Sequence, residues 1–282
     1  MAILQLNHEE VLALLPERDV NSHKGDYGKV LLLCGSRGYT GAAALSAMGA
    51  LRVGAGLVFL GVPESIYAIE AIKLTEPIVF PLPDQNGMFS VKAAKEIDQR
   101  LQNMDAVLIG PGIGQSPDCR NLVSYVLRTF KGPVVLDADG INVIAKHKDV
   151  LRGREGITIL TPHEGEFSRI SSFDENHRIA CAESFARECG VIVALKGHET
   201  VTTDGTTTYV NNTGNPGMAV GGSGDVLAGM IVGLLGQIKQ PLAVTASAVW
   251  LHGKAGDLCA QNLGQYGMLP SDMLNVLPQL LK

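Results

Sequence analysis

Residues 215–229 read NPGMAVGGSGDVLAG, a glycine-rich turn that runs directly into an apolar segment with helical spacing. The small residues of Gly221–Gly224 let the backbone approach a ligand closely, and the first N–H groups of the following helix have no partner within it. Helix N-termini attract anions for this reason, so the stretch predicts a phosphate site that needs no cationic side chain. Asp225 would either cap the helix or accept a proton from a bound hydroxyl group, and the pattern leaves both roles open.

The chain before this turn alternates short apolar runs with segments of helical spacing. The apolar runs have the length and composition of buried strands. A chain that alternates strand and helix predicts a mostly parallel sheet with helices on both faces. The expected strands are Val30–Gly35, Leu57–Val62, Ile78–Pro81, Asp105–Gly110, Val134–Asp137, Ile157–Leu160 and Val191–Leu195.

The last third of the chain has a different pattern. Asp204-Gly205 lies between two strand-like runs, Glu199–Thr203 and Thr206–Asn211, which predicts an antiparallel hairpin at the edge of the sheet.

Core packing explains Trp250 and His252, which lie mid-helix. No linker or repeat interrupts the chain, so residues 1–282 are predicted to form a single domain. The expected final helices are Val226–Leu235, Leu242–Cys259 and Ser271–Leu280, the last capped by Ser271.

Composition excludes several classes of function. The chain has 282 residues, 46% of them hydrophobic, 33 glycines and a net charge of −5. This charge argues against nucleic-acid and anionic-membrane partners but is neutral on small anionic ligands. The five cysteines are scattered without metal-type spacing and are expected to be reduced thiols. The N-terminal residues do not resemble a secretory signal and no apolar run is long enough to span a bilayer, so the expected compartment is the cytoplasm.

Polar and glycine-rich motifs follow several predicted strands, at the edge where open α/β sheets bind ligands. Gly110–Gly114 reads GPGIG, and its three glycines favour close contact with a ligand. Asp137 and Asp139 follow the next strand. They would orient a substrate or bind Mg²⁺ indirectly, and Asp139 would equally serve as a helix cap.

The next two strand ends carry the most polar motifs. Residues 161–166 read TPHEGE, in which His163 would hydrogen-bond a ligand and the glutamates would hold Mg²⁺ through water. Alternatively, Thr161 caps the following helix and Glu164 complements its dipole. Residues 196–200 read KGHET, and Lys196 at this edge suits a nucleotide phosphate, the alternative being a solvated lysine.

The first strand end resembles a dinucleotide-binding turn without matching one. No G-x-G-x-x-G is present, and no acidic residue ends the next strand. The small residues Thr40–Ala43 would still let a ligand lie against a helix start. The polar loop Asn21–Lys29 would be either a lid or a linker.

Taken in order, these motifs resemble one family throughout, the ADP-dependent NAD(P)H-hydrate dehydratases of ribokinase-like fold. The resemblance covers nearly the whole chain from about residue 8 and rests on the joint occurrence of the motifs. It implies a three-layer sandwich with a mostly parallel central sheet and a hairpin edge. The motifs are Gly25–Gly28, Gly110–Gly114, Asp137–Asp139, Thr161–Glu166, Lys196–Thr200 and Gly217–Asp225.

The resemblance also implies an activity, the repair of nicotinamide cofactors hydrated on the reduced ring. ADP would be the phosphoryl donor and Mg²⁺ a cofactor, with AMP, phosphate and NADH or NADPH as products. Asp225 would be the base and Gly222, Ser223 and Gly224 the anion hole. The hydrate would contact Ala42, Ala43, Gly112, Gly114, His163 and Asp225, the nucleotide would contact Lys196, Gly197, His198, Glu199, Thr200 and Gly224, and Glu166 would hold the metal through water.

Family members are described as tetramers, and functional coupling to a hydrate epimerase is expected. Two other functions compete with this reading. A small-molecule kinase of a vitamin precursor, such as a hydroxymethylpyrimidine or thiazole alcohol, shares the fold and would stop at the phosphorylated alcohol. A nucleotide-binding sensor without turnover is disfavoured because Asp225 is present at the position of the base.

Overall fold

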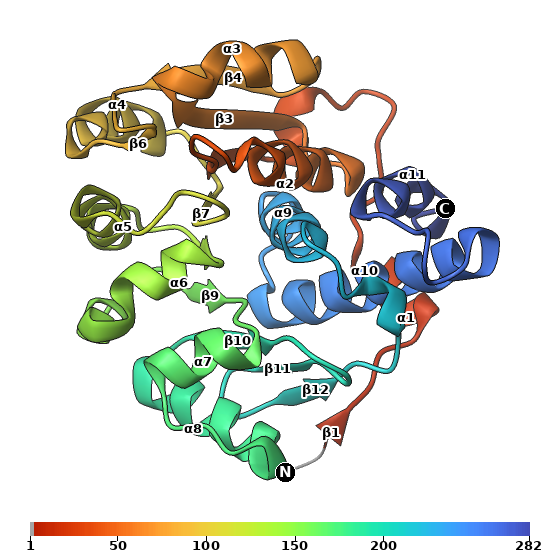
Figure 1. Cartoon of the computed structure of the whole chain (residues 1–282). Coiled ribbons are helices and arrows are strands. Elements are labelled where there is room, and N and C mark those ends of the chain that lie inside the picture. Colours follow the sequence, from red (N-terminus) through yellow and green to blue (C-terminus); the bar gives the residue numbers. More distant parts are fainter. Residues whose placement is uncertain (1–2) are drawn as a thin grey trace.

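The computed structural model describes residues 3–282, so residues 1 and 2 of the predicted domain lie outside the described part. A ten-stranded sheet runs through the molecule (Figure 1). The strands from β10 to β4 in the sheet run parallel to one another, and β11, which forms the predicted hairpin with β12, pairs antiparallel with β10. In sheet order the strands are β1 (Ile3–Leu4), β12 (Thr208–Val210), β11 (Val201–Thr203), β10 (Ile192–Leu195), β9 (Thr158–Leu160), β8 (Val134–Leu136), β7 (Ala106–Ile109), β2 (Lys29–Leu33), β3 (Leu57–Pro63) and β4 (Ile78–Leu82).

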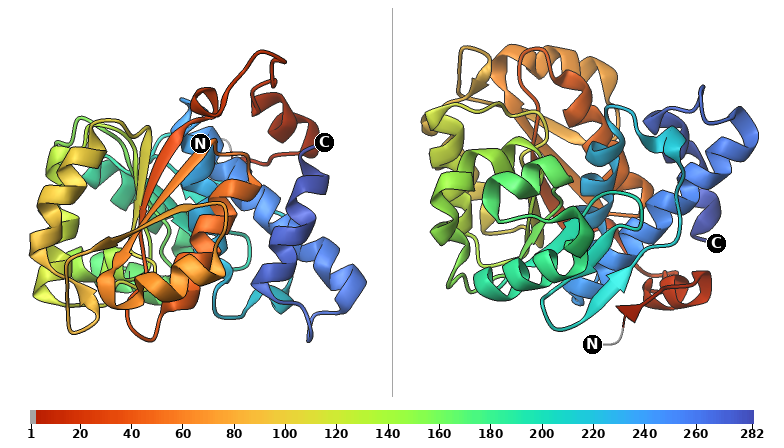
Figure 2. Two further views of the ribbon diagram at one scale, coloured as in Figure 1. Left: turned by 90° about the horizontal axis from the view of Figure 1, so that it is seen from above. Right: turned by 60° about the horizontal axis from the view of Figure 1, so that its bottom comes forward.

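Helices cover both faces of this sheet and complete three layers, which the edge-on view shows (Figure 2). One face carries α1 (His8–Leu14), α2 (Thr40–Arg52), α3 (Glu64–Lys73), α9 (Ser223–Leu235), α10 (Pro241–Leu263) and α11 (Pro270–Leu280). The other carries α4 (Ala94–Leu101), α5 (Pro117–Thr129), α6 (Asp139–Ile144), α7 (Glu164–Ile170) and α8 (Arg178–Cys189). The predicted fold class is therefore confirmed.

Alternation along the strands divides the apolar side chains between two cores. In β2, Val30 and Leu32 pack toward α2 and α9, whereas Leu31 and Leu33 pack toward α4 and α5. All four are completely buried, as expected for a central parallel strand covered on both faces. Because neighbouring strands run in the same direction, their carboxyl ends meet at one edge, where the polar motifs collect.

Glycines let α2 and α9 cross at very short range. A Cβ atom on Gly229 would lie 2.1 Å from the backbone oxygen of Ser46, and one on Gly49 would lie 2.6 Å from that of Val226. Gly233 makes a similar approach to Ala50. This contact fixes the direction of α9, whose N-terminus follows the glycine-rich turn Gly221–Gly224.

A few elements differ from the sequence predictions. Helix α3 and the short hairpin β5 (Asp84–Gln85) and β6 (Met88–Phe89) were not predicted. The predicted hairpin is not the outermost edge, because β1 pairs in parallel with β12. Ser271 does not cap α11, since Pro270 is its first residue and Asp272 accepts a hydrogen bond from the Leu269 N–H.

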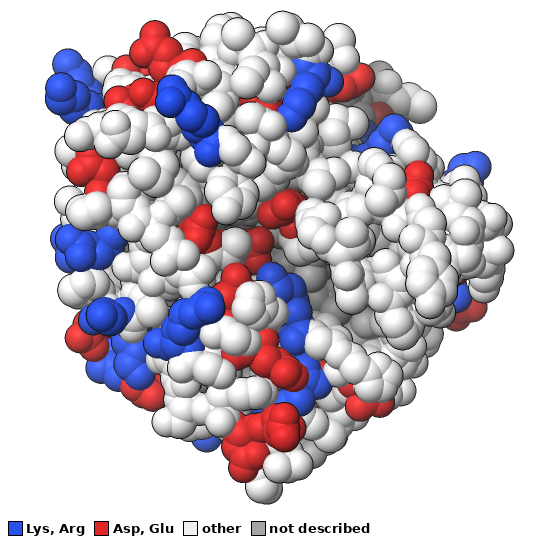
Figure 3. Space-filling model, viewed as in Figure 1, with Lys and Arg blue, Asp and Glu red and all other residues white. Residues whose placement is uncertain are grey.

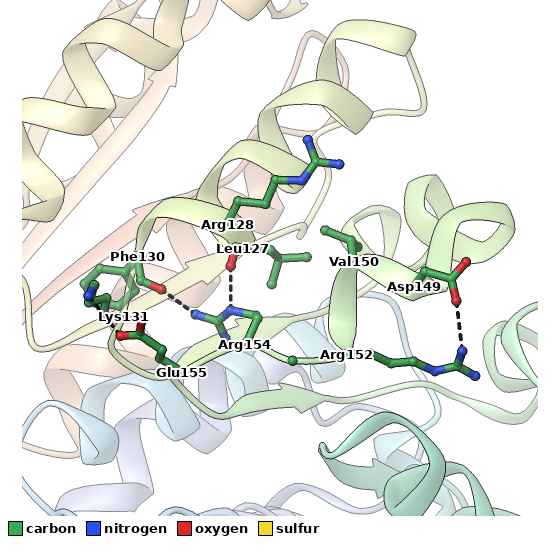
Figure 4. Close-up of a pocket in the computed structure, with 10 residues that line it drawn as sticks. Leu127, Arg128, Phe130, Lys131, Asp149, Val150, Arg152, Arg154 and Glu155 are labelled. Atoms are coloured by element: carbon green, nitrogen blue, oxygen red, sulfur yellow. Dashed lines mark hydrogen bonds and ion pairs between the residues drawn. The ribbon is translucent and has the colours of Figure 1, made fainter.

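A cavity of about 420 Å³ lies at the opposite, amino-terminal edge of the strands (Figure 4). Its floor is Arg154, which donates to the carbonyls of Leu127, Phe130, Gly132 and Ile157 and to the Thr158 hydroxyl. Burial lowers the pKa of Arg154 to about 10, so the group stays charged near neutrality. All five guanidinium N–H donors are used, which makes Arg154 a structural link between α5 and β9.

Candidate active site

The glycine turn and four of the predicted strand-end motifs meet at the carboxyl edge of the sheet. Figure 3 shows a hollow in the middle of one face of the molecule, where acidic and basic side chains lie close together. Backbone contacts are very close here, since a Cβ atom on Gly110 would lie 2.0 Å from the Asp137 carbonyl oxygen. His163 and Lys196 are joined by an isolated parallel bridge between the ends of β9 and β10.

The glycine-rich turn Gly221–Gly224 leads into α9 through Gly222, which is the N-cap residue and has a φ angle of +99°. Glycine suits this position because other residues rarely adopt a positive φ. Side-chain capping is absent at this N-terminus, so the first turn of a 13-residue helix presents its N–H groups without a competing side chain. Asp225 is the third residue of α9, which rules out the predicted alternative that it is the cap.

Asp225 has the electrostatic character of a general base. Burial and, to a smaller extent, the nearby charge of Asp137 raise the pKa of its carboxyl group, Lys196 opposes the increase, and the resulting pKa is about 6. A carboxylate with a pKa just below neutrality is deprotonated at pH 7 and still accepts a proton readily.

Lys196 is surrounded by acidic groups. Its Nζ atom donates to Asp137 Oδ1 at 2.9 Å and lies 3.8 Å from Glu166 Oε2. Burial lowers the pKa of Lys196, but Asp137 and Glu166 more than offset this effect and hold the pKa above its ordinary value. The predicted alternative of a solvated lysine is therefore wrong.

The same ammonium lies against the glycine turn. A Cβ atom on Gly224 would be 3.3 Å from Lys196 Nζ. The prediction of an anion site without a cationic side chain therefore needs correction, because Lys196 supplies a positive charge at the first turn of α9.

His163 and Glu166 contact each other rather than standing free. His163 is the N-cap of α7. Its ring Nδ1 accepts from the Glu166 backbone N–H at 3.3 Å, and its backbone N–H donates to Glu166 Oε2 at 2.9 Å. Thr161 does not cap this helix and donates to Asp137 Oδ1 at 2.7 Å instead. The His163 side chain is 56% exposed, so its ring remains accessible to a ligand.

This edge of the sheet offers carboxylate oxygens to Mg²⁺ but no complete set of protein ligands. Among residues 3–282, no three Asp, Glu, His or Cys side chains are placed to hold a metal ion together. Mg²⁺ is commonly held by one or two carboxylates together with water and substrate phosphates, so a single carboxylate is compatible with it. Glu166 already accepts from His163, and its remaining lone pairs suit a contact through water.

The loop Lys196–Thr200 has an unusual backbone that one arginine holds in place. Gly197 has φ +156° and Glu199, which is not a glycine, has φ +55°. Arg178 donates to the His198 carbonyl at 2.7 Å and to the Lys196 carbonyl at 3.4 Å. A second cavity of about 420 Å³ adjoins this loop and is lined by Arg178 and Glu199 among others. No sequence motif pointed to Arg178, because its contacts join two separate elements.

Three of the residues predicted to contact the hydrate, Ala42, Ala43 and Gly112, lie at or beside the start of α2. A Cβ atom on Gly112 would lie 3.0 Å from that of Ala42, and Ala43 is completely buried. Gly112 and Gly114 both have positive φ, so glycine is required by the backbone as well as by the close approach. Asp139 does not cap α6 and instead accepts from the Gly114 N–H at 2.9 Å, which braces this loop.

His252 also reaches the site, which the core-packing prediction missed. It is buried in α10, and its Nε2 lies 3.4 Å from the Ser223 hydroxyl. Burial lowers the pKa of His252 to about 4, so the ring is neutral at pH 7 and interacts with Ser223 as a neutral group. A lone histidine within an apolar helix face was the only signal in the sequence.

Solved structures place this sheet and its helices in the ribokinase-like class. A ribokinase-like superfamily protein from Enterococcus faecalis matches with a TM-score of 0.86 at 26% identity, covering 99% of this chain and 95% of that one. The crystal structure of the ADP/ATP-dependent NAD(P)H-hydrate dehydratase from Bacillus subtilis, co-crystallised with ATP and Mg²⁺, also matches with a TM-score of 0.86. It is 33% identical, and the match covers 99% and 98% of the two chains.

The family model described as NAD(P)H-hydrate dehydratase matches residues 30–279. The ADP-dependent (S)-NAD(P)H-hydrate dehydratase of Bacillus subtilis is 36% identical over 281 residues, covering 97% of this chain and 96% of the relative. The bifunctional NAD(P)H-hydrate repair enzyme Nnr of Moorella thermoacetica is 42% identical over 275 residues, and this chain spans 52% of its length. The chain belongs to the NAD(P)H-hydrate dehydratase family.

Proposed function

We propose that this protein is an ADP-dependent dehydratase that converts the hydrate of NADH or NADPH back to the reduced cofactor. The observation that carries the proposal is the pairing of Asp225, a half-buried carboxylate with a pKa of about 6, with the Lys196 ammonium and the open first turn of α9. A base and an anion site at one helix start suit the transfer of a phosphoryl group to a hydroxyl group.

The reaction follows from this arrangement in two steps. Asp225 accepts the proton of the ring hydroxyl while the hydroxyl oxygen attacks the terminal phosphorus of ADP, and AMP leaves. Gly222, Ser223 and Gly224 stabilise the charge on the transferred group through N–H donors and the helix dipole. The C–O bond to phosphate then breaks as the adjacent ring carbon loses a proton, which restores the ring double bond. Phosphate is a far better leaving group than hydroxide, so the transfer makes dehydration easy.

The remaining site residues bind the two substrates. The proposed hydrate site is Ala42, Ala43, Gly112, Gly114 and His163. The loop Lys196–Thr200, with Gly224, would hold the adenine nucleotide. Magnesium, when bound, neutralises phosphate charge, and Glu166 would hold it through water. The ATP and Mg²⁺ with which the Bacillus subtilis relative was co-crystallised support this assignment.

The cellular context extends the same proposal. Of the described residues, none belongs to a helix long and apolar enough to cross a membrane. We propose a cytoplasmic, tetrameric, single-domain enzyme. The bifunctional names of several relatives, of which this chain spans about half the length, support coupling to a second repair activity, which would be hydrate epimerisation.

Product analysis separates this function from a vitamin-precursor kinase. Incubation of hydrated NADH with ADP and Mg²⁺ is expected to yield AMP, phosphate and NADH in equal amounts by chromatography. A stable phosphorylated hydroxymethylpyrimidine or thiazole alcohol, formed while the hydrate stays unchanged, would favour the kinase instead.

The pH dependence of turnover provides a further prediction. The base must be deprotonated and its pKa is about 6, so kcat/KM for the hydrate should fall roughly tenfold per pH unit below about pH 6. An aspartate with an ordinary pKa near 4 would keep full activity to about pH 5. Initial rates between about pH 5 and pH 8, corrected for uncatalysed change of the hydrate, test this. A flat profile down to about pH 5 contradicts the assignment.

The nucleotide loop makes a separate prediction. Arg178→Met removes the donors that hold the Lys196 and His198 carbonyls and should weaken ADP binding by about 1–2 kcal/mol. The matched control is Arg187→Met on the same helix, where Arg187 donates to Gly205 at the hairpin tip. Calorimetry should show that only the first variant loses ADP affinity. Equal ADP affinities of the Arg178→Met and Arg187→Met variants would show that this loop is not part of the nucleotide site.

A further inference from the structure

Asp137 is a buried carboxylate to which the reaction above assigns no role. It directly follows strand β8 and is 1% exposed. Its Oδ1 atom accepts from the Thr161 hydroxyl at 2.7 Å and from Lys196 Nζ at 2.9 Å. These contacts come from three neighbouring strand ends, so one oxygen atom joins three of the sequence motifs.

The backbone around Asp137 is held tightly. Its carbonyl oxygen accepts from the Gly140 N–H at 2.9 Å and lies against Gly110. The next residue, Ala138, has φ +50° and ψ −116°, a conformation that costs free energy in a residue other than glycine. Such strain persists only where the surrounding structure fixes it, and it gives the Asp137 side chain one defined direction.

The position of Lys196 requires an explanation of its own. Its ammonium lies beside Gly224 in the first turn of α9, at the end of the helix that carries partial positive charge. A cation at this end is repelled by the helix dipole. Asp137, together with Glu166, supplies the attraction that holds Lys196 there, and the arrangement becomes favourable once an anion occupies the turn.

We propose that Asp137 is a positioning residue that holds the Lys196 ammonium at the first turn of α9, where it meets the phosphoryl group during transfer. This inference rests on the proposed function and deepens it. Without the Asp137 charge, the helix dipole would repel the Lys196 ammonium from the first turn of α9. The transferred phosphoryl group would then lose the contact with this cation.

A double-mutant cycle on the full chain tests this role. Lys196→Met should lower kcat by roughly 10²–10³-fold, the loss expected for removing one charge-stabilising donor. Asp137→Asn should lower kcat by roughly 10–100-fold, a smaller loss because the lysine remains. If Asp137 acts through Lys196, the double variant should be no slower than Lys196→Met within about twofold. Losses that multiply in the double variant would overturn the proposal.

Two further variants guard against a merely structural effect. Thr161→Val removes the hydroxyl that orients Asp137 without changing charge, and it should lower kcat in the same direction while leaving KM for the hydrate unchanged. Asp139→Asn is the matched control, since Asp139 follows the same strand but braces Gly114 and Gln115. Its effect should multiply with that of Lys196→Met. If Asp139→Asn showed the same coupling as Asp137→Asn, the cycle would be reporting general disturbance, and the specific role of Asp137 would be refuted.

The same cycle is read in a second way that does not depend on hydrate turnover. Calorimetric ADP affinity is measured for the four proteins, with thermal melts to establish that each is folded. Lys196→Met leaves Asp137 buried without its cation, and the double variant relieves this, so the double variant should melt above Lys196→Met. If the wild type fails to dehydrate the hydrate, the proposed function fails. The Asp137 inference is then tested by ADP affinity alone. It holds if the effects of Asp137→Asn and Lys196→Met on ADP affinity are coupled, and it is refuted if those two effects are independent.

Discussion

Asp225→Asn is expected to lower turnover of the hydrate by roughly two to four orders of magnitude, because an amide cannot accept the hydroxyl proton. Asp225 is the third residue of α9 rather than its cap, so the loss cannot be attributed to helix capping. ADP affinity should persist or rise, since the N–H donors of Gly222–Gly224 are untouched and one negative charge near the phosphates is removed.

Three measurements on the one variant separate these effects. A thermal melt reports folding, calorimetry reports ADP binding and the reduced-ring assay reports turnover. The substitution also neutralises a half-buried carboxyl group whose pKa is raised mainly by desolvation, so stability at pH 7 should not fall. Near-wild-type turnover in a folded Asp225→Asn protein would show that another group takes the proton.

Gly229→Ala is expected to destabilise the protein by about 3 kcal/mol or more, at the upper end of the cost of overpacking. The added Cβ atom would lie 2.1 Å from the Ser46 oxygen and 2.8 Å from its carbonyl carbon, both backbone atoms that cannot move aside alone. The helices α2 and α9 must therefore separate, and the glycine turn at the start of α9 would shift with them.

The matched control is Gly41→Ala, also within a helix. Nothing lies within 4 Å of a Cβ atom at Gly41, so this substitution should stabilise by about 0.4–1 kcal/mol through the unfolded chain. Denaturant unfolding without ligands compares the two. Equal stability of both variants would show that the α2–α9 crossing tolerates side chains and does not fix the position of α9.

The strands of the parallel part of the sheet and the helices on both of its faces followed from the sequence, because buried parallel strands are short, apolar and separated by helices. Helix α3 escaped prediction for a physical reason. Its buried positions are Ile66 and Glu70, so half of its inward stripe is acidic and the apolar period is weak. Glu70 is completely buried beside Lys73 at 3.5 Å, an environment that no local pattern announces. The β1 pairing depends on two residues and a partner some two hundred positions away.

The site was predictable in its backbone and less so in its side-chain contacts. Glycines at Gly112 and Gly222 mark positive φ angles that only a turn or close approach requires, so the loops were found. The contact of Lys196 with Asp137 joins residues 59 positions apart, and that of His252 with Ser223 joins residues 29 apart. Which strand-end side chains meet depends on register and rotamer, which sequence spacing does not specify.

The most direct test of the account is the absorbance of the reduced nicotinamide ring during incubation of the purified protein with hydrated NADH, ADP and Mg²⁺. We predict that the absorbance of NADH returns with time, at a rate proportional to protein concentration, and stops when ADP is omitted. Parallel reactions with ATP and with hydrated NADPH would define the preferred donor and substrate. A hydrate that remains unchanged in the presence of folded protein, either nucleotide and Mg²⁺ would contradict the proposed function.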